Sequence, residues 1–105
     1  MQLTSPTRAR AEQIVRLARL TMVSEREGDI HTLALDGEID LANAGEVEQE
    51  LRRVEATDVD VILVDLGGVS FIDSTGMKVF VMAAIRSNEH NRLVLQRAGP
   101  GVLRV

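Results

Sequence analysis

The alternation of apolar and polar residues predicts two neighbouring strands in the first half of the chain. Apolar residues recur at alternate positions from Leu20 to Glu27 and again from Ile30 to Asp36, which is the period of a strand with one covered face. Gly28-Asp29 separates the two runs, and glycine readily adopts the positive φ of a tight hairpin turn. We therefore expect two antiparallel strands joined by a short turn.

A helix is predicted from about Ala44 to Val54, where apolar residues recur at helical spacing. Its start is marked by Asn43 and Glu46, which resemble a capping box, and by Ala42 and Val47, which are placed as a hydrophobic staple. The apolar stripe is narrow and is flanked by charged residues. We expect this helix to cover a core with one face only.

The second half of the chain predicts a strand, a helix and another strand. The run from Val61 to Leu66 is apolar and β-branched, which is typical of a central strand buried on both faces. The apolar segment from Ser74 to about Asn88 predicts a helix that is buried over most of its circumference, and the segment from Arg92 to Gln96 predicts a strand. Such a strand-helix-strand unit is expected to be parallel and right-handed. Val102 to Val105 looks like the beginning of one more element.

The N-terminal segment predicts an additional helix over residues 6–19. Ser5-Pro6 is typical of a helix start, because serine caps helices and proline is tolerated at the first helical position. Apolar residues then recur at helical spacing opposite a basic side. We expect this helix to pack on the domain or on a second copy of the chain, with a membrane-surface anchor as the alternative. The side chains expected to be buried are Ile14, Leu17 or Ala18.

Together these elements predict a single domain of the α/β class, with helices packed on a mixed four-stranded sheet and an extra N-terminal helix. A chain of 105 residues is long enough for one core and too short for two. Residues 1–19 are interpreted as an amphipathic helical extension, and residues 20–105 as the α/β domain.

Composition excludes several classes of function. There is no cysteine, so disulfides and thiolate metal sites are excluded. The net charge of −4, with two Phe and no Tyr or Trp, argues against direct binding to nucleic acid, which needs cationic and stacking surfaces. The longest apolar run, Val79 to Ile85, is far too short to cross a bilayer. With no signal-peptide pattern either, we expect a cytoplasmic protein without membrane contact.

Candidate chemistry is concentrated in Asp73-Ser74-Thr75-Gly76, between the predicted central strand and the buried helix. Asp, Ser and Thr are preferred helix N-caps, so a capping role is one interpretation. A hydroxyl at the positive end of a helix, on an accessible edge, is also a suitable position for a phosphate. The residues alone leave both interpretations open.

Three blocks of sequence follow one another in order along the chain. They are Leu35-Asp36-Gly37-Glu38-Ile39-Asp40-Leu41-Ala42, Val64-Asp65-Leu66-Gly67-Gly68-Val69 and Ser70-Phe71-Ile72-Asp73-Ser74-Thr75-Gly76-Met77. Together they resemble the STAS domain of anti-sigma factor antagonists. The resemblance covers about residues 20–100, so that residues 20–105 are identified as a STAS domain.

The resemblance implies a protein-protein switch controlled by phosphorylation. In that family an anti-sigma factor, which is also a kinase of the histidine-kinase-like ATPase class, phosphorylates the serine that Ser74 matches, and a phosphatase reverses the reaction. The unmodified domain binds the anti-sigma factor and releases a sigma factor. The residues then expected to contact the partner are Asp40, Asp73, Thr75, Gly76 and Met77.

The chain departs from the family pattern at both ends. Family members usually continue with a helix after the last strand, so that helix is expected to be short or truncated here. The predicted N-terminal helix would then cover the apolar surface left open, or join two copies into a homodimer.

Other functions are less well supported. Catalysis by Ser74 would need a base, and only His31, expected to be a half-buried or surface residue of a strand, and His90 are available. The glutamates of the first predicted helix point in different directions, so no metal site is expected. Gly67-Gly68 lacks nucleotide-loop spacing and is interpreted as a turn, so no cofactor is expected. The remaining alternative is a STAS scaffold or an accessory subunit of a stress-signalling or transporter complex, without phosphorylation.

Overall fold

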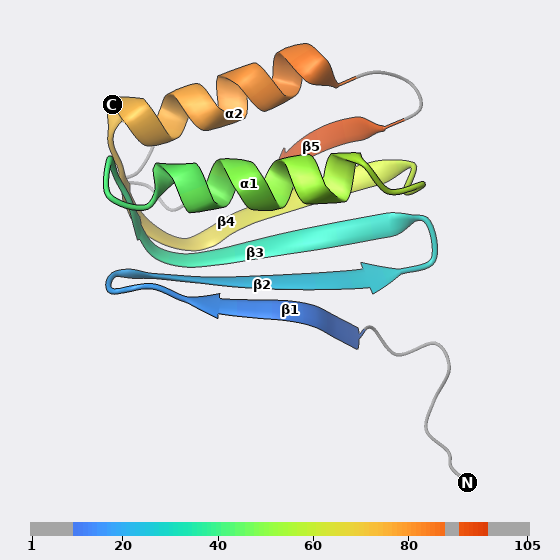
Figure 1. Ribbon diagram of the computed structural model, residues 1–105, viewed down its shortest axis with the longest axis horizontal. Coiled ribbons are helices and arrows are strands. Elements are labelled where there is room, and N and C mark those ends of the chain that lie inside the picture. The colour runs from blue at the N-terminus through green and yellow to red at the C-terminus, as the bar shows by residue number, and fades with distance from the viewer. Residues whose placement is uncertain (1–9, 88–90, 97–105) are drawn as a thin grey trace, which may run out of the picture.

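The computed structural model describes residues 10–87 and 91–96. They form one sheet with the strand order β1-β2-β3-β4-β5 and two helices (Figure 1). The β1-β2 and β2-β3 pairs are antiparallel, whereas β3-β4 and β4-β5 are parallel. In chain order the elements are β1 (Arg10–Arg16), β2 (Leu20–Glu27), β3 (Ile30–Ile39), α1 (Ala44–Glu55), β4 (Val61–Ile72), α2 (Ser74–Arg86) and β5 (Arg92–Gln96).

The mixed sheet is confirmed, but it has five strands where the sequence predicted four. The additional strand is β1, so the prediction of a helix over residues 6–19 is wrong for residues 10–16. Ile14 pairs with Val23 and is 51% exposed, whereas Val15 packs partly against the core. Pairing with β2 outweighs the helical spacing, because local propensity is a weak preference that tertiary contacts override. Ser5-Pro6 lies outside the described residues.

The side chains expected to be buried on the N-terminal helix are distributed differently in the structure. Leu17 packs partly against the core, whereas Ala18 is exposed and lies between β1 and β2. A homodimer formed through an N-terminal helix therefore loses its structural basis in residues 10–16, which are hydrogen-bonded into the sheet of their own domain.

The predicted hairpin and first helix are both confirmed, but the predicted cap of the helix is not. Gly28 turns the chain between β2 and β3 with φ 63°. Asn43 occupies the N-cap position of α1 without a side-chain cap hydrogen bond. Its amide is used in the preceding loop instead, donating to the backbone oxygen of Glu38 at 2.9 Å and accepting from the backbone N–H of Asp40 at 3.0 Å.

The central position of β4 is confirmed, but its burial on both faces is not. Ile62 and Val64 are buried under the helices, whereas the alternating residues Val61 and Leu63 are only partly buried. The described helices pack on one face of the sheet, so the other face keeps partial access to solvent. The strand also continues to Ile72 through the two glycines that the sequence interpretation placed in a turn.

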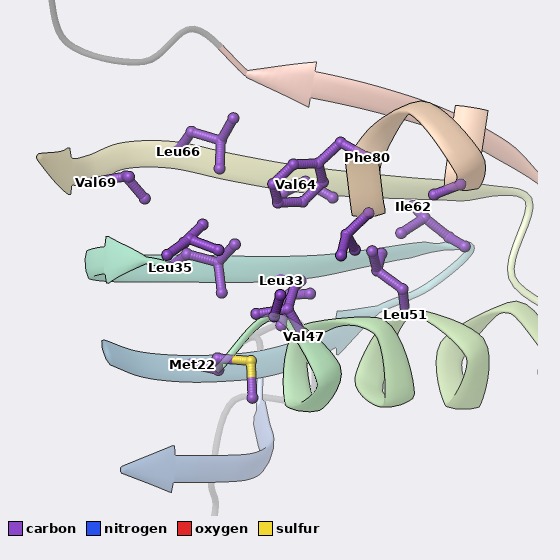
Figure 2. Close-up of a cluster of buried hydrophobic side chains, with 14 of the residues drawn as sticks. Met22, Leu33, Leu35, Val47, Leu51, Ile62, Val64, Leu66, Val69 and Phe80 are labelled. Atoms are coloured by element: carbon purple, nitrogen blue, oxygen red, sulfur yellow. The ribbon is translucent and has the colours of Figure 1, made fainter. Parts of the chain in front are cut away.

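The core lies between this sheet and both helices. Figure 2 shows Val47 and Leu51 of α1 and Phe80 of α2 directed toward buried residues of the central strands. The helix α2 is confirmed, but only one side of it is buried: Phe80 is 3% exposed and Ile85 is 70% exposed. The strand β5 has the predicted bounds. The element expected at 102–105 and the expected short C-terminal helix lie outside the described residues.

Candidate functional site

The helix that carries the candidate serine is capped by its neighbour Asp73. The Asp73 carboxylate accepts a hydrogen bond from the backbone N–H of Gly76 at 2.9 Å through Oδ1, and one from the backbone N–H of Leu41 at 3.1 Å through Oδ2. The backbone N–H of Asp73 donates to the carbonyl of Ile39 at 3.1 Å. Asp73 therefore joins the start of α2 to the end of β3.

Ser74 is the first residue of α2 and is exposed. Because Asp73 makes the side-chain cap hydrogen bond, capping gives no reason for a hydroxyl at position 74. The residue lies at the positive end of the helix dipole, where an anion is stabilised. Lys78 follows one helical turn later and is also exposed, and residues four apart on a helix are neighbours. The geometry suits a phosphate carried on Ser74.

Gly76 brings the first turn of α2 against the sheet. A Cβ atom at this position would lie 2.7 Å from Cγ2 of Ile39 and 3.0 Å from Cγ2 of Ile72. Only a glycine allows so close an approach without rearrangement. Gly76 is consequently buried, while Thr75 and Met77 on either side are partly buried. This close packing gives Gly76 a structural role, and its expected contact with a partner stays a prediction.

Asp40 organises the loop between β3 and α1. Its Oδ1 accepts from the backbone N–H of Ala42 at 3.0 Å, and its backbone oxygen accepts from the N–H groups of Asn43 and Ala44 at 3.1 and 2.8 Å. Its Oδ2 accepts a hydrogen bond from the guanidinium of Arg19. That bond is the main reason why the pKa of Asp40 is lowered, and the pKa of Arg19 is raised by the same contact.

Asp40 and Asp73 are connected in the structure through the residue that follows Asp40 in the chain. Leu41 follows Asp40 and donates its N–H to Asp73. Its side chain is 76% exposed. A single exposed apolar residue needs no explanation, but this one also lines a groove.

The groove runs between α1 and α2 beside Ser74 and has a volume of about 430 Å³. Its lining is mainly apolar and includes one acidic and one basic residue, Glu48 and Lys78. The lining residues are Leu41, Ala44, Gly45, Glu48, Thr75, Lys78, Val79 and Met82.

Among the residues that line this groove, only Thr75 was predicted from the sequence as a partner contact. Leu41 could have been predicted as a contact residue, because it is an apolar residue directly after Asp40. Met82 and Lys78 were read as part of a buried helix and gave no separate signal. Arg19 was assigned to the predicted N-terminal helix, so its contact with Asp40 was missed.

The histidine in the described part of the chain is remote from Ser74. His31 is the second residue of β3, whereas Asp40 follows the other end of that strand, so the two lie at opposite ends of β3. The expectation that His31 is half-buried or on the surface is wrong: it is 0% exposed and its Nε2 lies 2.6 Å from the Ser24 hydroxyl. His90 lies outside the described residues.

No group of three or more potential metal ligands occurs among residues 10–87 and 91–96. No helix in this part of the chain is long and apolar enough to cross a membrane.

Comparison with known proteins identifies the family. The family model described as STAS domain matches residues 21–105, and the chain belongs to the STAS domain family. An anti-sigma-B factor antagonist from Listeria monocytogenes is 38% identical over 61 residues, which are 58% of this chain and 54% of that relative. A protein of the same description from Listeria innocua matches to the same extent. The chain thus spans about half the length of the curated relatives it matches.

Solved structures share the fold. An anti-sigma factor antagonist from Mycobacterium paratuberculosis superimposes with a TM-score of 0.73 at 24% identity, over 81% of this chain and 72% of that one. A STAS domain of an antisigma-factor antagonist from Rhodobacter sphaeroides superimposes with a TM-score of 0.64 at 18% identity, over 82% of this chain and 98% of that one. At these identities the likeness concerns the fold.

Proposed function

We propose that this chain is an anti-sigma factor antagonist whose binding to an anti-sigma factor is controlled by phosphorylation of Ser74. The observation that carries the proposal is that two neighbouring residues at the start of α2 have separate roles. Asp73 makes the cap hydrogen bond to Gly76, while Ser74 is exposed beside it at the positive helix end. The names of the Listeria relatives give the proposal its partner class.

The contact surface we propose extends from Ser74 across Leu41 into the groove between α1 and α2. An exposed leucine that lines a groove offers apolar surface that a partner protein can bury. Asp40, Asp73, Thr75 and Met77 surround this surface and are the predicted contact residues. Glu48 and Lys78 at its border would select a partner by charge, because charges at an interface rim act mainly on specificity and association rate.

Phosphorylation would change the charge of that surface. A phosphoserine adds about −1.5 to −2 charges at neutral pH. In the free domain the helix end and Lys78 would attract the phosphate, so the fold should persist. In the interface with a bound partner, the same phosphate would lose its hydrating water close to the negative charge of Asp73. Both effects oppose binding, so the partner would dissociate. The switch is therefore electrostatic and steric, with no rearrangement of the domain required.

The test is phosphate transfer from ATP. The purified chain is incubated with Mg-ATP and each histidine-kinase-like anti-sigma factor of its organism, and its intact mass is measured. One phosphate is expected on wild type and on Thr75→Ala, and none on Ser74→Ala. Phosphate on Thr75 would contradict the assignment of the residue. Stable binding of such a protein without any phosphate transfer would favour the role of scaffold or accessory subunit.

Reversal requires a phosphatase in the same pathway. Candidate phosphatases are incubated with the phosphorylated chain, and return to the unmodified mass should restore binding to the anti-sigma factor. If dephosphorylated protein failed to bind again, phosphate would not be the controlling group.

A further inference from the structure

Arg19, in the turn between β1 and β2, is fixed to the end of β3 by both its backbone and its side chain. Its carbonyl accepts a hydrogen bond from the N–H of Glu38 at 2.8 Å. Its Nε lies 3.4 Å from Oε1 of Glu38, and its Nη2 donates to Asp40. Gly37 permits this approach: its φ is 119°, and a Cβ there would lie 2.1 Å from the Arg19 carbonyl oxygen.

The contact with Arg19 continues to the candidate phosphorylation site through a series of hydrogen bonds. Asp40, which Arg19 binds, also holds the N–H of Ala42. The residue between them, Leu41, donates its own N–H to Asp73, which caps the helix that begins at Ser74. The β1-β2 turn, the loop over residues 40–43 and the start of α2 are therefore connected in one network.

We propose that Arg19 is a positioning residue for the Ser74 site, which holds the loop over residues 40–43 so that Leu41 is presented to a partner protein in one conformation. The part of this inference that concerns a partner rests on the proposed function. The bond from Arg19 is charge-assisted, and such bonds are shorter and stronger than neutral ones. It fixes a loop whose leucine is 76% exposed.

This role differs from a contribution to stability. The side chain of Arg19 is 54% exposed, and exposed ion pairs contribute little to the free energy of unfolding. Removing the guanidinium should therefore leave the unfolding transition almost unchanged, while the order of the loop and the presentation of Leu41 are lost. If Arg19 acted mainly by stabilising the fold, its replacement would instead lower the free energy of unfolding.

The first test uses the isolated protein and needs no partner. Amide chemical shifts are followed by NMR during an acid titration of wild type, Arg19→Gln, Arg19→Lys and the control Arg16→Gln, which changes an exposed arginine at the end of β1. The amide of Ala42 reports protonation of the Asp40 carboxylate that it binds. In Arg19→Gln this titration should move to higher pH and the backbone order parameter of Leu41 should fall. Arg19→Lys should keep part of both effects, and Arg16→Gln should match wild type.

The second test measures affinity for the anti-sigma factor that binds the wild-type chain. Arg19→Gln should bind at least about tenfold more weakly, equivalent to roughly 1.4 kcal/mol, with Arg16→Gln unchanged. Unchanged order at Leu41, or unchanged affinity with a disordered loop, would overturn the proposal. If no anti-sigma factor bound wild type, the proposed function would fail, and the NMR titration alone would decide whether Arg19 positions the loop.

Discussion

Leu41 donates its backbone N–H to the Asp73 carboxylate at 3.1 Å, across 32 positions of sequence. The same carboxylate accepts the N–H of Gly76. One side chain therefore caps α2 and ties it to the loop that carries the most exposed leucine of the described residues. The position of Ser74 relative to the proposed contact surface depends on these two hydrogen bonds.

Replacing Asp73 should destabilise the domain more than replacing Ser74. Asp73→Ala removes the N-cap, which typically costs about 0.5–2 kcal/mol, and also releases Leu41. Ser74→Ala removes an exposed hydroxyl from a helix position that needs no cap, and should change the free energy of unfolding by less than about 0.5 kcal/mol. Urea denaturation of both variants tests the order. Equal losses would mean that Ser74 also caps the helix.

Gly76→Ala and Gly45→Ala should change stability in opposite directions. Alanine is favoured over glycine inside helices by about 1 kcal/mol. A Cβ on Gly45 in α1 meets nothing within 4 Å, whereas one on Gly76 would lie 2.7 Å from Ile39. Gly45→Ala should therefore be neutral or stabilising, and Gly76→Ala should cost about 1–3 kcal/mol through overpacking. Thermal unfolding measures both, and a stabilised Gly76→Ala variant would show that α2 can shift away from the sheet.

Stability toward acid should depend on Glu50, a carboxylate that is 4% exposed on the inner side of α1. Burial pushes its pKa upward, but hydrogen bonds from Arg53 and Ser24 and the charge of Arg53 lower it overall. Because the pKa is lower in the folded than in the unfolded state, the unfolded chain takes up the proton first. The contribution is present above the ordinary pKa of a glutamate and is lost as the pH falls through the folded value.

Glu50→Gln tests this acid dependence. Glu50 accepts hydrogen bonds from Gln13, Ser24 and Arg53, and an amide accepts through only one of its two polar atoms. The variant should lose about 1–3 kcal/mol at neutral pH. The loss should shrink as the pH falls through the lowered pKa of Glu50, where the wild-type carboxylate is itself protonated. Denaturation curves at several pH values give the comparison, with Glu48→Gln on the same helix as control. A loss independent of pH would show that charge is not its cause.

The first strand should contribute to stability without carrying the site. A chain that starts at Leu17 keeps Arg19 but lacks β1, its pairing with β2 and the hydrogen bond from Gln13 to Glu50. We expect a lower melting temperature, with phosphorylation of Ser74 retained. Val15→Ala, which removes a side chain packed on the core, should cost more than Ile14→Ala at a 51% exposed position. The reverse order would indicate that Ile14 is covered in solution.

The sequence predicted those elements whose pattern is local. The β2-β3 hairpin, α1, α2 and β5 each carry their own period or turn residue, and each was placed correctly within a few residues. The strand β1 was missed because its apolar spacing also fits a helix and its pairing with β2 is a tertiary contact. Burial was overestimated for β4 and α2, because an apolar run does not tell how many faces are covered.

The expected site residues came from the resemblance to a known family. Asp40, Asp73 and Ser74 belong to the blocks that carry this resemblance, and their roles stay predictions. The bond from Arg19 to Asp40 could not be foreseen, because it requires β1 and β2 to be strands and Gly37 to let the turn approach. The groove likewise depends on how α1 and α2 lie against each other.

Phosphorylation of Ser74 should leave the fold intact and still abolish binding to the anti-sigma factor. A negative group at a helix N-terminus is stabilising by about 0.3–1 kcal/mol at low ionic strength, and Lys78 lies one turn away on an exposed position. The phosphorylated chain should therefore unfold at an equal or slightly higher urea concentration than the unmodified chain, and the difference should fall in Lys78→Ala and in high salt.

Ser74→Asp should weaken binding to the anti-sigma factor, and Ser74→Ala should bind constitutively. Both should keep the circular dichroism spectrum of wild type. Loss of helix on phosphorylation, or a large change of the amide shifts around Gly76 and β3, would mean that the phosphate acts by rearranging the domain and not by changing the charge of its contact surface.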